Sequence, residues 1–178
     1  MHKMIFASLA IAAVVKINLC TLYFDGTNLT HTNGSNVINM FDGMPGAKQS
    51  YLRHDNTFNK DGAVVLTKKQ GKYRTLYVPG VGAGRLNLNK DEQAYQATTG
   101  AGIEKNILIG YKYLVEVCEK DFGVNYELRL IGFSRGAIMS RMISNYLAKY
   151  GISAENLKPN GKSTFLETTI MNPISLSS

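Results

Sequence analysis

The stretch Leu128–Arg141, read as LRLIGFSRGAIMSR, holds the residues of this sequence best suited to chemistry. An apolar run enters Gly132-Phe133-Ser134-Arg135-Gly136, and a helix-like pattern follows. This is the G-x-S-x-G nucleophile elbow in its expected setting of strand, tight turn and helix. A nucleophilic serine stands exposed on a strained turn, and glycines two residues to either side let the strand and the helix approach closely. Ser134 is therefore predicted to be the nucleophile of a serine esterase or lipase of the α/β-hydrolase type, the alternative being a simple helix N-cap.

Further groups must support that serine. The backbone N–H of Arg135, directly after the nucleophile, would supply one donor of an oxyanion hole. The second donor is expected in the turn after the first strand, where Gly26 and Thr27 are best placed. Asp25 in the same turn is expected to hold it by accepting backbone N–H bonds rather than to react. The side chain of Arg135 has two interpretations, an ion pair with a lipid phosphate or a salt bridge within the fold, and the structural role is slightly favoured.

The partners that would activate the serine are missing downstream. In α/β hydrolases the acid and the histidine follow the serine along the chain, but no histidine or aspartate follows Ser134 here. The histidines are His2, His31 and His54. Three explanations stay open. The chain is a fragment of a longer gene, it is an inactive remnant that keeps the fold core, or His31 or His54 completes the site in a non-standard order.

Apolar periodicity predicts the elements that position these residues. Strands are expected at 17–24, 75–78, 127–131 and 168–171, and helices near 36–41, at 103–122 and at 135–150, the last with Ile138, Met142, Ile143, Tyr146 and Leu147 on its apolar side. Residues 28–62, apart from the short helix, and residues 85–100 are expected to be polar loops. The glycines of 80–84 are expected to give loop flexibility rather than a phosphate cradle. Strands that alternate with helices indicate an α/β fold, with a mostly parallel sheet and helices on both faces.

Composition sets further limits. The 178 residues suit one domain, taken as 16–178 after a segment 1–15. The apolar run 4–15 is either a short signal peptide or a first packed element, and it is too short to span a bilayer as a helix. The formal charge of +7 is scattered rather than clustered, so no nucleic-acid partner is expected, and contact with anionic lipid is only weakly favoured. Cys20 and Cys118 are expected to be buried free thiols, and no metal or cofactor is expected.

Several motifs together resemble a known family. They are Phe24-Asp25-Gly26-Thr27-Asn28, Tyr77-Val78-Pro79-Gly80-Val81-Gly82, and Gly132-Phe133-Ser134-Arg135-Gly136-Ala137 with Arg141. The helix entry Gly100-Ala101-Gly102-Ile103, with Tyr111 and Leu114 beyond it, adds to the likeness. Over about 22–151 the chain resembles the DUF2235 family, the catalytic domain of the Tle1-like phospholipase effectors of the bacterial type VI secretion system.

The resemblance implies an α/β-hydrolase fold and a serine lipase that cleaves ester bonds of membrane phospholipids. It implies a bacterial effector delivered into the periplasm of a rival cell, and in many cases a neighbouring immunity protein. In that family the chain continues to a further strand with an aspartate and later to a histidine. The alternatives to an enzyme are an inactive hydrolase core that binds lipid or an immunity protein, and a non-functional gene fragment.

Overall fold

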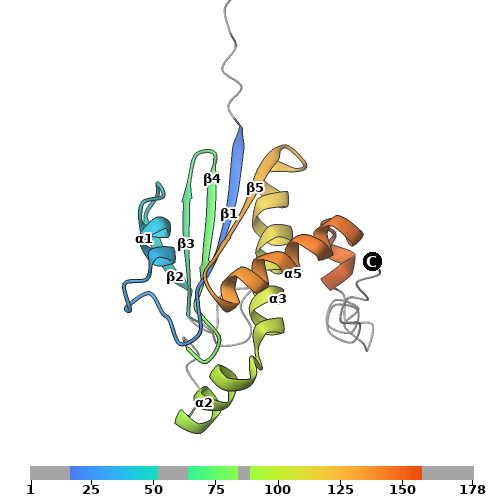
Figure 1. Cartoon of the computed structure of the whole chain (residues 1–178). Coiled ribbons are helices and arrows are strands. Elements are labelled where there is room, and N and C mark those ends of the chain that lie inside the picture. Colours follow the sequence, from blue (N-terminus) through green and yellow to red (C-terminus); the bar gives the residue numbers. More distant parts are fainter. Residues whose placement is uncertain (1–16, 52–63, 84–88, 158–178) are drawn as a thin grey trace, which may run out of the picture.

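The computed structural model describes residues 17–51, 64–83 and 89–157. The strands are β1 (Asn18–Phe24), β2 (Lys48–Tyr51), β3 (Val65–Gln70), β4 (Tyr73–Val78) and β5 (Tyr126–Gly132). The helices are α1 (Asn36–Asp42), α2 (Lys90–Thr99), α3 (Ile103–Tyr113), a π-helical segment η1 (Leu114–Glu119), α4 (Lys120–Phe122), α5 (Arg135–Tyr150) and a short 3₁₀ turn η2 (Ala154–Leu157) (Figure 1). The predicted segments 1–15 and 168–171 lie outside the described residues, as does His54. None of the helices described is long and apolar enough to cross a membrane.

The strands form one sheet in the order β2-β3-β4-β1-β5. β1 pairs in parallel with both β4 and β5, so the three strands that carry the predicted motifs end at the same edge. β2 pairs with β3, and β3 with β4, in antiparallel fashion. The α/β class is confirmed, and the sheet is mixed because β2 and β3 extend its parallel part, on the β4 side, by two antiparallel pairings. β2 lies where a loop was predicted, and no strand was predicted over β3.

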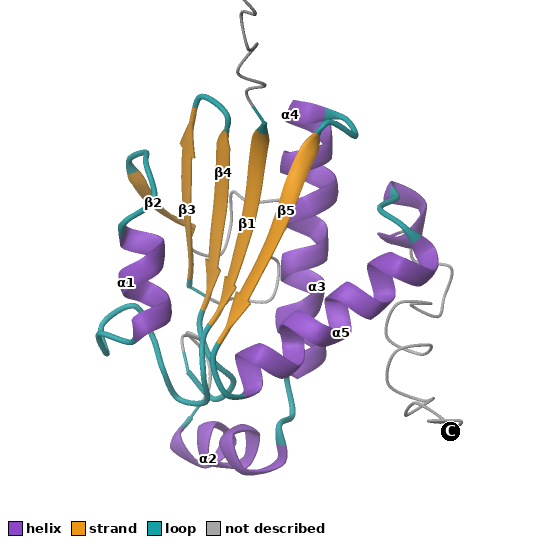
Figure 2. Ribbon diagram, turned by 45° about the horizontal axis from the view of Figure 1, so that its top comes forward, coloured by secondary structure: helices purple, strands orange, loops and turns teal. Residues whose placement is uncertain are grey.

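Helices cover both faces of the sheet, as predicted (Figure 2). Side chains alternate along each strand, so Leu22 and Phe24 belong to one core cluster and Tyr23 to the other. The first cluster packs under α3 and α5, and the second packs under α1. On α5 the predicted apolar side is rotated, because Ile138 is 51% exposed while Met139 is fully buried.

A helix occupies the segment 90–99, where a polar loop was predicted. This helix, α2, has no buried residue, so hydrophobic periodicity could not reveal it. Its start has a capping box, in which Asn89 accepts from the Glu92 N–H and Glu92 accepts from the Asn89 N–H. Gly100 ends the helix in the left-handed conformation, with φ of 80°.

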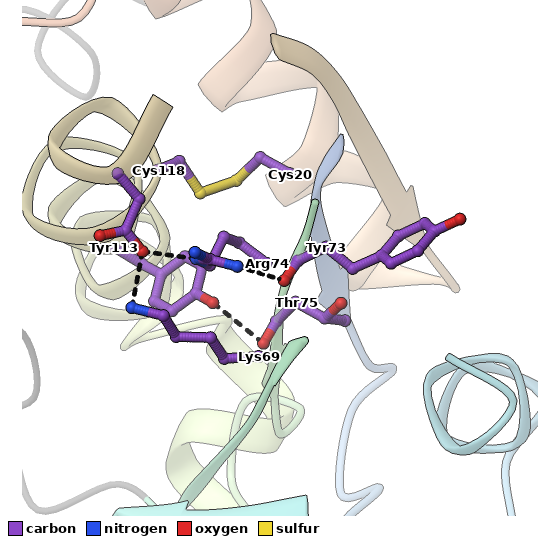
Figure 3. The surroundings of a disulfide bond; sticks show 8 residues. Cys20, Lys69, Tyr73, Arg74, Thr75, Tyr113 and Cys118 are labelled. Carbon is purple, nitrogen blue, oxygen red and sulfur yellow. Dashed lines mark hydrogen bonds and ion pairs between the residues drawn. A yellow bond between two sulfur atoms is a disulfide. The ribbon is translucent and has the colours of Figure 1, made fainter. Parts of the chain in front are cut away.

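The predicted helix 103–122 is continuous, and a covalent bond fastens it to the sheet. Cys118 in η1 forms a disulfide with Cys20 in β1, and both residues are fully buried (Figure 3). The expectation of free thiols is therefore wrong. The two residues are 98 positions apart in the chain, and only the packing of the helix on β1 brings their Cα atoms to 6.1 Å.

Polar contacts lie on the same side of the sheet as the disulfide. The Tyr113 hydroxyl donates to the Thr75 carbonyl at 3.2 Å. Arg74 and Lys69 form ion pairs with Asp121 at 2.5 and 2.8 Å (Figure 3). Burial acts to raise the pKa of Asp121, but hydrogen bonds from Lys69 and Arg74 outweigh it, so the pKa lies below its ordinary value of 3.8.

Replacing Asp121 with asparagine is expected to lower the free energy of unfolding by about 1 kcal/mol at pH 7, since the pair is partly solvent-screened. A carboxylate with a depressed pKa stabilises the fold fully above its unfolded pKa, and that contribution disappears as the pH falls through the folded-state value. Urea unfolding should therefore separate Asp121→Asn from the native chain at pH 7, and the gap should close as the pH falls below 3.8 and through the lower pKa of the folded state. The exposed Glu127→Gln variant is the control and should leave the midpoint unchanged; a constant gap at all pH values would contradict the prediction.

Candidate active site

Ser134 occupies a sharp turn between β5 and α5. Its φ and ψ are 54° and −122°, a conformation that non-glycine residues rarely adopt. Such backbone strain is kept where the surrounding structure imposes it, and it is common at functional sites. Ser134 stands at the N-cap position of α5 but makes no capping hydrogen bond with its side chain, so the simple N-cap interpretation fails. Its side chain is exposed. Figure 2 shows that β5 ends at the same edge of the sheet as β1 and β4.

Gly132 and Gly136, two residues to either side of Ser134, lie where a Cβ atom would clash with neighbouring backbone. A Cβ on Gly132 would lie 2.2 Å from the carbonyl oxygen of Gly136. A Cβ on Gly136 would lie 2.0 Å from the carbonyl oxygen of Phe24, at the end of β1. No side chain can occupy these spaces, so the spacing of the motif is what allows β5, α5 and β1 to meet.

The turn after β1 is held by the buried carboxylate of Asp25. Its Oδ1 accepts the N–H of Gly26 at 2.8 Å, and its Oδ2 accepts the hydroxyls of Ser35 at 2.6 Å and Tyr77 at 2.7 Å. Burial raises the pKa of the Tyr77 phenol, and the hydrogen bond to Asp25 raises it further. The carboxylate accepts one backbone N–H, as expected, but sequence reasoning missed the two hydroxyls. Tyr77 stands in the second quoted motif, whereas no pattern pointed to Ser35.

Replacing Asp25 with asparagine should lower the free energy of unfolding by about 1–3 kcal/mol. The amide keeps one acceptor oxygen, so at least one of the three donors, which are buried or partly buried, loses its partner. Thermal or urea unfolding measures the loss. Asp42→Asn, which alters an exposed ion pair with Lys48, is the matched control and should have little effect. Equal stability of the Asp25 and Asp42 variants would show that the carboxylate does not hold the turn.

The same hydrogen bonds narrow the candidates for an oxyanion hole. The N–H of Gly26 is bonded to Asp25, so it is not free to bind another anion. Within the described ranges, the backbone N–H groups of Thr27 and Arg135 donate no hydrogen bond. The N–H of Phe133 donates to the carbonyl of Phe24 at 3.2 Å, which joins the elbow to the end of β1. Thr27 and Arg135 are therefore better candidates than Gly26.

The side chain of Arg135 points into the fold. Its guanidinium donates to Thr27 Oγ1 at 2.9 Å, to the carbonyl of Thr98 at 3.2 Å, and to the carbonyl of Ala97. The structural role of this side chain is supported, but the expected salt bridge is wrong for the described residues, because its partners there are neutral oxygens rather than a carboxylate. Arg141, two turns along α5, is exposed.

The glycines after β4 serve close packing rather than flexibility. A Cβ on Gly80 would lie 1.6 Å from the carbonyl oxygen of Gly26. A Cβ on Gly82 would lie 2.6 Å from Asn28 Oδ1 and 2.9 Å from the carbonyl oxygen of Gln93 in α2. The expected flexibility is therefore wrong for these two glycines, and Gly84 lies outside the described residues. Their lack of side chains lets the β1 turn and α2 approach the end of β4.

In the described part of the chain, no side chain that could act as a general base is hydrogen-bonded to Ser134. The Ser134 hydroxyl has no hydrogen-bonding partner there, and His31 is exposed in the turn of Thr30–Asn33 without a contact to it. The same ranges contain no group of side chains that could hold a metal ion. A hollow of about 310 Å³ lies at the start of β5, lined by residues such as Val124, Tyr126 and Ile152, and no elbow residue contributes to it.

Comparison with known proteins adds one match. The sequence model of the family described as "T6SS, Phospholipase effector Tle1-like, catalytic domain" matches residues 18–167. That range holds every strand and helix described above. No curated protein and no solved structure matches the chain significantly.

Proposed function

Since this chain belongs to the Tle1-like catalytic domains of type VI secretion phospholipase effectors, we propose that it is a serine-dependent phospholipase domain with Ser134 as nucleophile. Membership makes the protein a bacterial secreted effector with a lipid substrate that acts in target cells. The proposal adds the α/β-hydrolase type of mechanism and the residues that carry it out.

The single observation that carries the proposal is the backbone of Ser134. A serine with φ of 54°, exposed between the parallel strand β5 and the helix α5, has the geometry that an elbow nucleophile requires. The flanking contacts of Gly132 and Gly136 support the same interpretation, because they fix the turn by close packing.

The chemistry proposed is acyl transfer. Ser134 Oγ attacks the carbonyl carbon of a lipid ester, and its proton passes through a base to the alcohol that leaves. Water then hydrolyses the acyl-serine and releases the fatty acid. The oxyanion formed at each step would accept hydrogen bonds from the N–H groups of Arg135 and Thr27, and loss of one such donor typically costs about 10²–10³ in rate. Asp25 keeps a structural role, and we assign no base.

The disulfide bears on where the enzyme works. Disulfides form and persist in oxidising compartments, and the bacterial periplasm is one of them. The Cys20–Cys118 bond therefore supports the proposal that the protein acts in the periplasm of a target cell. An immunity protein that blocks the Ser134 edge of the sheet belongs to the same proposal.

The test is fatty acid release from vesicles of phosphatidylethanolamine and phosphatidylglycerol by the oxidised protein. Because no histidine follows Ser134, the rate of this chain should be low and should rise with added imidazole, which can act as an external base. A phosphonate probe that reacts with activated serines should label Ser134, as located by mass spectrometry of the peptides. Vesicles that stay intact with imidazole, together with an unlabelled Ser134, would refute the proposal.

A second candidate is a non-catalytic module that binds lipid. The observation in its favour is the Ser134 hydroxyl, which has no base beside it among the described residues. Such a module would sediment with vesicles, would release no fatty acid with imidazole present, and would bind equally well as Ser134→Ala.

A further inference from the structure

Helix α2 lies across the edge of the sheet where Ser134 stands, but it has no apolar anchor (Figure 2). None of its residues is buried, and its ends are satisfied by the Asn89–Glu92 capping box and by Gly100. Amphipathic packing usually holds a helix of this length on its protein. Other contacts must therefore hold α2 in place.

Arg135 provides such a contact at the last turn of α2. Its guanidinium donates to the carbonyls of Ala97 and Thr98, at the end of the helix where carbonyl oxygens lack helical partners and carry partial negative charge. A planar guanidinium has several donors in fixed directions, so it can bind more than one oxygen at once. In the described part of the chain Arg135 forms no ion pair. Its guanidinium is bound there by the two α2 carbonyls and by the hydroxyl of Thr27.

The same guanidinium reaches the turn after β1 through Thr27 Oγ1 at 2.9 Å. The backbone of Thr27 is a candidate oxyanion donor, and the backbone of Arg135 is the other. Arg135 therefore carries one candidate oxyanion donor on its own main chain. With its side chain it also holds the turn that contains the other donor, the N–H of Thr27. Gly82 supports this arrangement, because the absence of a Cβ lets α2 lie against the same turn.

We propose that the Arg135 side chain is a positioning residue that holds α2 and the Thr27 turn in register with the Ser134 elbow. Without it, α2 separates from the sheet edge and the Thr27 N–H loses its fixed direction. The catalytic part of this inference depends on the function proposed above, whereas the structural part does not.

Amide hydrogen exchange tests the structural part without any turnover. Arg135→Met keeps the aliphatic stem of the side chain and the backbone N–H but removes the guanidinium. Exchange should increase at least tenfold in 90–100 and in 26–28, while β1 and β4 keep the protection of the native chain. Arg141→Met, an exposed arginine on the same helix, is the matched control and should change neither segment. Native exchange in either segment of Arg135→Met would overturn the proposal.

The thermodynamic link between Arg135 and Thr27 needs a double-mutant cycle. Thr27→Val removes the acceptor hydroxyl and should raise exchange in α2 less than Arg135→Met does. In the Arg135→Met background Thr27→Val should add almost nothing, because the contact is already lost. Additive effects of the two changes would overturn the proposal even if each variant alone loosens α2.

Kinetics then test the positioning role. Arg135→Met should lower kcat by about 10- to 100-fold with little change in KM, as expected when a transition-state donor is misplaced. Arg135→Lys keeps the charge with fewer directed donors and should recover part of the loss. An equal rise in KM with kcat unchanged would overturn the role. If Ser134→Ala leaves hydrolysis intact, the proposed function fails, but the exchange results still decide whether Arg135 holds α2.

Discussion

Ser134→Ala should reduce imidazole-supported release of fatty acid from phospholipid vesicles to the level of buffer. The reason is that the attacking oxygen is gone, so no acyl-enzyme can form. In serine hydrolases with all their partners present, loss of the nucleophile costs on the order of 10⁶ in kcat. Here the starting rate is expected to be lower, so a mass spectrometric readout of free fatty acid is the suitable measurement.

The matched control is Ser144→Ala, which removes an exposed hydroxyl from α5 ten residues further along. It should keep the native rate and should still be labelled by the phosphonate probe. The Ser134 variant should also keep the native midpoint of unfolding, or gain slightly, because alanine removes a functional group but no packed side chain. Hydrolysis that continues at the native rate in Ser134→Ala would exclude this serine as nucleophile.

Reduction of the Cys20–Cys118 disulfide should cost about 2–5 kcal/mol of the free energy of unfolding. The bond joins residues 98 positions apart, and cross-links that close long loops restrict the unfolded chain most. For a domain of this size, 1 kcal/mol moves the Tm by about 2–4 °C, so a decrease of about 5–20 °C is expected. Thermal unfolding followed by circular dichroism, with and without a phosphine reductant, measures it.

A double variant separates the cross-link from the packing of the two buried sulfurs. Cys20→Ala with Cys118→Ala should unfold near the Tm of the reduced native chain, and reductant should not move it further. The disulfide joins η1 to the first half of β1, whereas Ser134 follows the carboxyl end of β5. The reduced protein should therefore keep its relative reactivity at temperatures below its Tm. Equal Tm values for oxidised and fully reduced protein would contradict a stabilising bond.

The elements that contribute most to the site were predictable from local pattern. α5 spans 135–150 and ends at Gly151 as predicted, and β1 differs from its predicted start by one residue. These segments bury one stripe or both faces, so their apolar periodicity records their environment. The elbow was predictable for a similar reason. Its glycines are required by contacts within a few residues or with the neighbouring β1, and these leave a fixed spacing in the sequence.

α2 was not predictable from the local sequence pattern. The helix buries no residue, so it has no apolar stripe, and its capping box of Asn89 and Glu92 is a weaker signal. β2 and β3 were missed as well. β3 buries its first four residues in a row and exposes the last two, and β2 has only four residues. Neither strand therefore shows the alternation of apolar and polar residues that marks a strand with one exposed face.

The sequence by itself determined which serine stands at the turn and which strands and helices flank it, because those features depend on neighbours within one or two elements. The tertiary structure alone decided that Cys20 meets Cys118, that Asp25 accepts the hydroxyls of Ser35 and Tyr77, and that the Arg135 side chain binds the last turn of α2. Each of these outcomes joins residues or competing donors whose distances are set by the packed sheet. The disulfide joins residues 98 positions apart, and the hydrogen bond from Arg135 to Ala97 spans 38 positions. Contacts at such separations produce no periodic pattern in the intervening sequence.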